Sequence, residues 1–303
     1  MGVCGSDLHW FARQVIGDAR LTRPLVLGHE FSGRTAEGVR VAVDPALPCH
    51  RCEFCRRGDP NLCPQIRFAG HGEVDGAMRE YLAWDAGCLY PLPDSISDDE
   101  GAMLEPLGVA LHAVDLAHLQ PGMTVGVFGC GPVGLLIIQA ARIAGAIKVI
   151  ATDLLPHRVE VARSLGADQA FLVSGSPLAA ALQDTTGGRG LDVAFEAAGT
   201  QAAVDDAFQA VVPGGKVLLV GIPTEDTTSF TASLARRKGL TIKLVRRMKH
   251  TYPRAIELVQ KGWVDVRSLV THHFPLEQAG QAFQTAARRE GIKVIIHMEQ
   301  TTN

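Results

Sequence analysis

Four cysteines, Cys49, Cys52, Cys55 and Cys63, are close enough in the sequence to bind one metal ion. Thiolates at this C-x2-C-x2-C-x7-C spacing can converge on Zn²⁺ with bonds of about 2.3 Å. Four protein ligands close the coordination sphere, so such a site stabilises a loop and does no chemistry. Free core thiols and a nucleic-acid zinc ribbon are the alternatives, and the formal net charge of -3 disfavours the ribbon. The sequence therefore predicts a structural zinc in the loop 49–63.

A glycine-rich turn, Gly129-Cys-Gly131-Pro132-Val133-Gly134, follows a strand-like run and precedes an apolar helical stretch. In a G-x-G-x-x-G turn the first glycine permits the tight turn and the second lets the backbone approach a pyrophosphate. The third allows close packing of helix on strand. The sequence therefore predicts that these residues bind a dinucleotide.

Asp153 closes the next strand-like run, where its carboxylate can accept hydrogen bonds from a ribose diol. A carboxylate there repels the 2′-phosphate of NADP, so we expect NAD, although the nearby Arg158 favours the phosphate. The alternative interpretation is a plain helix-opening turn in which Asp153 caps a helix over 156–165.

Strand-like and helix-like segments alternate from about residue 107 to 247, which predicts a parallel sheet covered on both faces. The segment 1–106 contains short strand-like runs such as Gly38–Val43 and no long helical period, so we expect strands and loops there. The tail, 248–303, is expected to return to the first domain. The expected strands are Thr124–Phe128, Lys148–Thr152, Gln169–Val173, Asp192–Glu196, Lys216–Gly221 and Lys293–His297, and the expected helices are 132–145, 156–165, 177–185, 201–210, 253–261 and 276–288.

The composition excludes several classes of protein. A chain of 303 residues that is 47% hydrophobic and 20% charged can bury a sizeable core, so disorder is excluded. The longest apolar stretch, Val133–Ala141, is too short to span a bilayer, and the first residues do not form a secretory signal. Clustered cysteines suit a reducing compartment. We therefore expect a cytoplasmic protein with no nucleic-acid or membrane partner.

Three further segments carry potential metal ligands: Cys4-Gly5-Ser6-Asp7-Leu8-His9, Gly28-His29-Glu30 and Leu104-Glu105-Pro106. Singly each is ordinary. Together with the cysteine loop, the glycine-rich turn and the segments 61–64 and 270–276, they resemble the zinc-dependent medium-chain dehydrogenases of the alcohol dehydrogenase family. Within that family the pattern is similar to the sorbitol and threonine dehydrogenase branch. The resemblance covers nearly the whole chain and implies an α/β protein, with a Rossmann doubly wound parallel sheet and a GroES-like β-rich catalytic domain.

The resemblance implies a catalytic zinc bound by Cys4 and His29, with Glu30 or Glu105 as the third protein ligand. One coordination position is then left for water or a substrate oxygen, and zinc acts as a Lewis acid while the alcohol loses a hydride to NAD. Ser6 is expected to accept the hydroxyl proton, and His9 to pass it to solvent. Two zinc ions per chain are therefore expected.

The remaining cofactor contacts are also implied by the resemblance. Val220, Gly221 and Ile222 end the strand that lies under the nicotinamide in relatives, and Arg247 matches an arginine that contacts substrate and cofactor. Relatives are commonly dimers or tetramers, so a homodimer or homotetramer is expected.

The implied reaction is hydride transfer from a secondary alcohol of a polyol or sugar alcohol to NAD. Amino-alcohol oxidation of the threonine 3-dehydrogenase kind is one alternative. Relatives carry a longer segment ahead of the Cys-Gly-x-Asp sequence, so we expect that the N-terminal part of the catalytic domain is missing and that Met1 is a misassigned start. A native mass near 32.3 kDa would contradict that expectation. A truncated, catalytically impaired NAD-binding relative is the second alternative.

Overall fold

The computed structural model describes residues 1–173 and 178–298. The chain forms two compact units. The first comprises Met1–Gly108 and Arg247–Asn303, and the second comprises Val109–Arg246.

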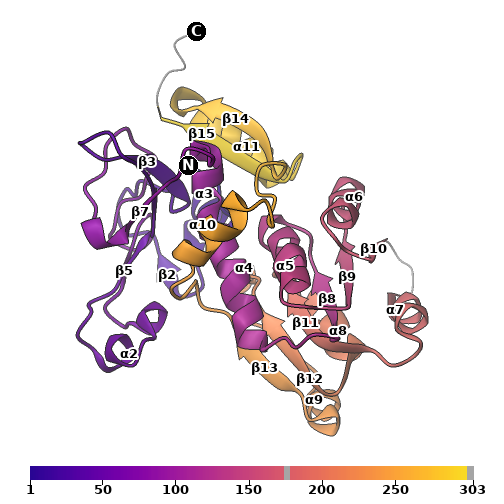
Figure 1. Ribbon diagram of the computed structural model, residues 1–303. Helices are drawn as coiled ribbons and strands as arrows, with labels where there is room; N and C mark the ends of the chain where they lie inside the picture. The colour runs from indigo at the N-terminus through magenta and orange to yellow at the C-terminus, as the bar shows by residue number, and fades with distance from the viewer. Residues whose placement is uncertain (174–177, 299–303) are drawn as a thin grey trace. The chain divides into compact units, whose positions relative to one another are not determined.

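A six-stranded parallel sheet forms the centre of the second unit (Figure 1). Its strand order, β10-β9-β8-β11-β12-β13, starts in the middle and runs outward in both directions, which is the doubly wound order of dinucleotide-binding sheets. The central strands are buried on both faces, so they are apolar without alternation. The strands are β8 (Thr124–Phe128), β9 (Lys148–Asp153), β10 (Gln169–Leu172), β11 (Leu191–Glu196), β12 (Val211–Leu219) and β13 (Thr241–Leu244).

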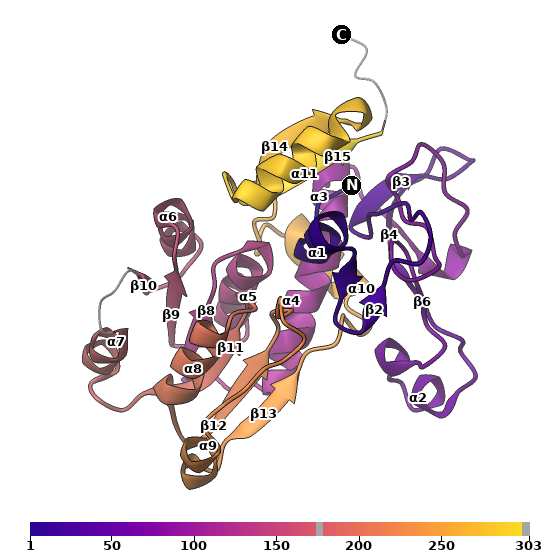
Figure 2. The ribbon, with the colours of Figure 1, turned by 180° about the vertical axis from the view of Figure 1, so that it is seen from behind.

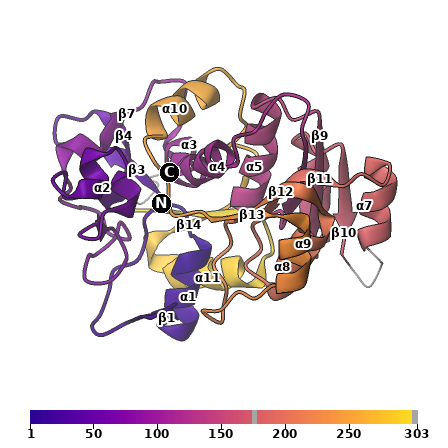
Figure 3. The same cartoon turned by 90° about the horizontal axis from the view of Figure 1, so that it is seen from below.

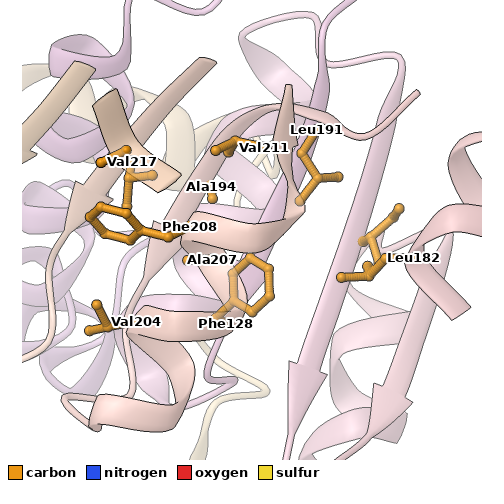
Figure 4. Close-up of a cluster of buried hydrophobic side chains, with 11 residues drawn as sticks. Phe128, Leu182, Leu191, Ala194, Val204, Ala207, Phe208, Val211 and Val217 are labelled. Atoms are coloured by element: carbon orange, nitrogen blue, oxygen red, sulfur yellow. The ribbon is translucent and has the colours of Figure 1, made fainter. Parts of the chain in front are cut away.

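Helices cover both faces of this sheet. Figure 3 shows α5 on one side of the strands and α8 and α9 on the other. The helices of this unit are α5 (Pro132–Ile143), α6 (Pro156–Ser164), α7 (Leu178–Thr186), α8 (Gln201–Ala210) and α9 (Ala232–Lys238). Between α8 and the sheet lies a hydrophobic cluster that includes Phe128, Leu191, Val204, Phe208 and Val217 (Figure 4).

The α/β class and the parallel sheet are confirmed. A sixth strand, β13, was not predicted, because its four residues at the sheet edge include a lysine and give only a weak strand pattern. The strand predicted from Lys216 begins earlier, at Val211, and ends at Leu219, so Gly221 lies beyond it. The predicted start of one helix at residue 177 lies outside the described residues.

The first unit is built from small sheets. β3 (Phe31–Arg34), β4 (Arg40–Val43) and β7 (Leu89–Pro91) form an antiparallel sheet, and β14 (Val270–Pro275) pairs with β15 (Lys293–His297) in parallel. Figure 2 shows α11 packed along β14 and β15. The two remaining pairs are β1 (Val15–Ile16) with β2 (Ala19–Arg20) and β5 (Ala46–Leu47) with β6 (Arg67–Phe68).

Short helices connect these sheets. The α-helices of the first unit are α1 (Gly5–Arg13), α2 (Glu53–Arg56), α3 (Asp98–Ala102), α10 (Tyr252–Gln260) and α11 (Ala279–Arg288); α4 (Leu104–Ala117) contains the point at which the units divide. Single 3-10 turns occur at η1 (Pro60–Leu62), η2 (Ala86–Cys88) and η3 (Leu276–Gln278). Among the described residues, none of the helices has the length and apolar character that a bilayer span requires.

Helices α1, α2, α3 and the start of α4 correct the expectation that residues 1–106 contain only strands and loops. α1 begins after Cys4, and Asp7 accepts the Cys4 backbone N–H at 3.0 Å, which places a helix start where no Ser or Thr cap signals one. α4 is buried almost all round, so its sequence lacks the polar face on which helical periodicity depends.

Gly134, in the first turn of α5, lies so close to the backbone of Gly129 that there is no room for a side chain. A Cβ there would lie 1.9 Å from the Gly129 carbonyl oxygen, whereas a Cβ on Gly280 in α11 would meet nothing within 4 Å. We predict that Gly134→Ala lowers the free energy of unfolding by about 1–3 kcal/mol because the backbone must shift. Gly280→Ala should raise it by up to about 1 kcal/mol because alanine favours the helix. Urea unfolding of both variants measures the difference, and equal effects would contradict it.

Candidate active site

Three potential metal ligands, Cys4, His29 and Glu30, come together in the first unit. One ligand atom from each lies within 4.8 Å of the others. The first residues of the chain cause this approach, because the Gly2 N–H donates to the Glu30 carbonyl at 2.7 Å and so brings Cys4 beside His29. A thiolate, an imidazole and a carboxylate are a donor set that Zn²⁺ accepts, and three protein ligands leave a coordination position open. These residues therefore fit a catalytic zinc.

Asp7, to which the sequence assigned no role, orients His29. The His29 Nδ1 lies 3.3 Å from Asp7 Oδ1, and Asp7 is fully buried. Burial lowers the pKa of His29, but the Asp7 carboxylate and the Cys4 sulfur outweigh burial and raise it well above its usual value. A proton held on Nδ1 leaves the Nε2 lone pair for a metal. An acidic residue three positions after Cys4, in the first turn of a helix, was the signal that could have identified Asp7.

Lys293 is a buried partner of Glu30 that the sequence did not reveal. The Lys293 Nζ on β15 contacts Glu30 Oε2 and donates to the Val3 carbonyl at 3.2 Å. Both side chains are almost completely buried, at 2% and 1% exposed. Burial lowers the pKa of Lys293, but Glu30 and Cys4 outweigh burial and raise it. The lysine therefore stays charged and holds the carboxylate beside His29.

Glu105, the other predicted third ligand, is buried in the first turn of α4 but is not part of the Cys4, His29 and Glu30 group. Burial raises its pKa to about 8, and the neighbouring Glu30 carboxylate acts in the same direction. The geometry therefore favours Glu30 as the zinc ligand.

Ser6 and His9 lie three residues apart on α1, and so on the same side of the helix. The Ser6 hydroxyl lies 3.3 Å from the His29 Nε2, next to the position that the metal would take. His9 is half-buried, and burial together with the charge of Arg13 lowers its pKa. The two side chains can therefore take part in moving a proton away from the metal centre.

The four thiols of the predicted structural site also come together, with all four sulfur atoms within 4.8 Å of one another. Cys52 caps α2, Cys55 lies within α2, and Cys63 follows η1. The Cys49 backbone N–H points to the Cys63 sulfur at 3.4 Å, a contact that favours a thiolate. These residues fit a tetrahedral zinc.

In the second unit, the glycine-rich turn lies between β8 and α5. Gly129 has φ +106, and Gly131 is the N-cap of α5, where no side chain covers the first backbone groups of the helix. Backbone N–H groups at such a helix start can bind a phosphate. The Cys130 N–H donates to Asp153 Oδ2 at 2.7 Å, which holds this carboxylate beside the turn. The arrangement fits the pyrophosphate and ribose of a dinucleotide.

Arg158 and the segment 220–222 lie at the same end of the sheet as the glycine-rich turn, where the parallel strands have their carboxyl ends. A Cβ on Gly131 would be 3.7 Å from Arg158 Nη1, so the guanidinium lies over the turn. Gly221 approaches the backbone of Gly199 so closely that a Cβ would lie 2.2 Å from its nitrogen. Ile222, by contrast, is exposed.

Arg247, predicted to contact the cofactor, belongs to the first unit. Its guanidinium carbon lies 4.1 Å from the centroid of the Phe68 ring, a cation–π contact. Its role toward a cofactor stays a prediction.

Comparisons with known proteins identify two protein families that match this chain. Residues 1–94 match the family described as alcohol dehydrogenase GroES-like domain, and residues 132–261 match the family described as zinc-binding dehydrogenase. Sorbitol dehydrogenase of Bacillus subtilis (strain 168) is 37% identical over 309 residues, which cover 98% of this chain and 88% of the relative.

Two solved structures are also similar. One is an oxidoreductase/dehydrogenase of unknown specificity, involved in membrane biogenesis, from Escherichia coli, with a TM-score of 0.92 and 32% identity, covering 99% of this chain and 90% of that one. The other is a short chain alcohol dehydrogenase from Escherichia coli CFT073 in complex with NADH, with a TM-score of 0.89 and 28% identity, covering 98% of this chain and 89% of that one.

Zinc content distinguishes Glu30 from Glu105 as the third ligand. We predict that Glu30→Gln loses one zinc per chain, because an amide is a weaker ligand than a carboxylate, whereas Glu105→Gln keeps both ions. Glu30→Gln also leaves Lys293 buried without its partner, which destabilises the fold. The double variant Glu30→Gln/Lys293→Met removes both charges and should still lack that zinc. Elemental analysis after gel filtration measures this, and zinc loss from Glu105→Gln alone would reverse the assignment.

Proposed function

The chain belongs to the zinc-dependent medium-chain dehydrogenases, and on that basis we propose that it oxidises a secondary alcohol of a polyol or sugar alcohol with NAD. The gathering of Cys4, His29 and Glu30 around one point carries this proposal, because it supplies a metal site with an open position. Similarity to a sorbitol dehydrogenase supports the substrate class.

Each of these residues has a separate task in the proposed reaction. Cys4, His29 and Glu30 would hold zinc, which supplies Lewis-acid polarisation of the alcohol oxygen when bound. Asp7 keeps the proton of His29 on Nδ1, and Lys293 keeps Glu30 in place. The Cys49–Cys63 loop would bind the second zinc and only stabilise the fold.

Removing the hydroxyl proton falls to the side chains of α1. The Ser6 Oγ lies beside the His29 Nε2, so it can accept a hydrogen bond from the substrate hydroxyl and pass the proton on. His9, with its lowered pKa, releases a proton to solvent readily near neutral pH.

Steady-state rates of NADH formation test the proposed substrate class. We expect kcat/KM for sorbitol or xylitol to exceed that for threonine by at least about tenfold, which corresponds to roughly 1.4 kcal/mol. Cys4→Ser, which removes a zinc ligand, should abolish the activity, whereas Cys88→Ser, a buried thiol outside both zinc sites, should keep it. Faster oxidation of threonine would favour the amino-alcohol alternative, and no turnover with any alcohol would favour an impaired relative.

We propose NAD rather than NADP because the Asp153 carboxylate is fixed beside the glycine-rich turn by the Cys130 N–H. Asp153→Asn should lower kcat/KM for NAD roughly 10–100-fold, because charge-assisted hydrogen bonds to the ribose contribute about 1.5–3 kcal/mol. Activity with NADP should fall less or rise. Asp168→Asn is the matched control, since Asp168 pairs with Arg142 and accepts the Val149 N–H. An unchanged ratio of NAD to NADP activity in Asp153→Asn would contradict the assignment.

We also propose a cytoplasmic location and a homo-oligomeric assembly. Zinc-binding thiolates persist in a reducing compartment, which favours the cytoplasm. The family pattern favours a homodimer or homotetramer, which light scattering of the purified protein tests.

A further inference from the structure

A third group of metal-binding side chains lies in the first unit, apart from both predicted zinc sites. Asp99 on α3, His273 on β14 and His297 on β15 each offer one ligand atom, and these atoms lie within 4.8 Å of one another. We propose that these three residues bind a divalent transition-metal ion of the Zn²⁺ class. The proposal does not depend on the dehydrogenase activity.

The fold brings the two histidines together on one face of the β14–β15 pair. His273 pairs with Ile295, and His297 follows Ile295 by two residues, so the two histidines are diagonal neighbours. Their rings stack with centroids 5.4 Å apart, and His273 Nδ1 lies 3.2 Å from His297 Nε2. Two ring nitrogens that face each other need a proton or a cation between them.

Asp99 supplies the third donor and the negative charge. Its Oδ2 lies 3.5 Å from His273 Nδ1, and its Oδ1 lies 3.5 Å from His297 Nε2. Both distances exceed the usual 2.7–3.2 Å of an N–H···O hydrogen bond. Its sequence neighbours pair with arginines, Asp98 with Arg40 and Glu100 with Arg267. Asp99 faces the two imidazoles, and its charge also acts on the buried N-terminal ammonium of Met1.

The distance between the two imidazole nitrogens, and the distance from each of them to one of the two Asp99 oxygens, are close to those around a bound zinc ion. Ligand atoms at about 2.0–2.1 Å from a tetrahedral Zn²⁺ are roughly 3.3–3.4 Å from one another. Two imidazole nitrogens and one carboxylate oxygen suit Zn²⁺, Co²⁺, Ni²⁺ or Cu²⁺ better than Ca²⁺ or Mg²⁺. The side chains are 27%, 51% and 40% exposed for Asp99, His273 and His297, so the site is open to solvent and water can complete the coordination. A bound ion would link α3 to β14 and β15.

Metal titration of the purified full-length protein tests the site. Its tightly bound zinc is first counted, and further Zn²⁺ is then added in competition with a chromogenic chelator. We expect one additional equivalent, and at least a tenfold weaker affinity for it in His273→Gln, in His297→Gln and in Asp99→Asn, because each loses one ligand. His272→Gln is the matched control. This neighbouring histidine contacts Thr271 and lies outside the cluster, so its loss should leave the additional equivalent unchanged.

Two further readouts keep the result unambiguous. Added Zn²⁺ should raise the thermal unfolding midpoint of the wild type but not of His273→Gln/His297→Gln, because an ion that binds only the folded state stabilises it. Rates of NADH formation without added metal should be the same in that variant as in the wild type, which separates this site from the catalytic zinc. The proposal would be overturned if the wild type bound no additional equivalent, or if all four single variants bound it equally. The cluster would then be only a hydrogen-bonded pair of histidines, His273 and His297.

Discussion

The balance of buried charge around His29 is the constraint on which the first unit depends. Asp7, Glu30 and Glu105 are buried carboxyl groups in this unit, and Lys293 supplies a buried positive charge. Burying charges without partners is expensive, and Lys293 pairs with Glu30 alone, so a Cys4 thiolate adds a negative charge that this lysine does not balance. A divalent cation at Cys4, His29 and Glu30 would balance it. Burial raises the pKa of Glu105 to about 8, and the neighbouring Glu30 carboxylate acts in the same direction.

The second unit depends on a different constraint, the close approach of backbone to backbone. Gly134 and Gly221 lie where a Cβ would meet the main chain, and both are near the edge of the sheet at which β8 and β12 end. The same lack of side chains that permits this packing also leaves backbone groups accessible to a phosphate at the start of α5. Close packing of α5 and the proposed binding of a dinucleotide at its start would therefore both require a glycine at Gly134.

Ion pairs between residues that are distant in the sequence join elements of the first unit. Lys293 joins β15 to Glu30, Lys249 pairs with Asp59 within the cysteine loop at 2.6 Å, and Arg267 pairs with Glu100 on α3. These contacts connect the segment 247–303 to the segment 1–108, so the residues of the metal site are positioned from both ends of the chain.

The sequence by itself determined the features that are local. The spacing of four cysteines, the glycine-rich turn between a strand and a helix, and the alternation of strands with helices each depend on neighbours within a few residues. Periodicity therefore revealed the parallel sheet, and motif residues indicated zinc and a dinucleotide. Helices α1 and α4 were not predicted, because α1 starts without a Ser or Thr cap and α4 lacks a polar face.

Only the tertiary structure decided which distant groups meet. It placed Glu30 rather than Glu105 with Cys4 and His29, put Asp7 on the His29 ring and Lys293 on Glu30, and gathered Asp99, His273 and His297. Pairing between strands and packing of α3 against them set these contacts, and neither leaves a spacing rule in the sequence. A ligand set drawn from separate elements is fixed by the geometry of the fold, because each side chain alone is compatible with an ordinary surface or core position.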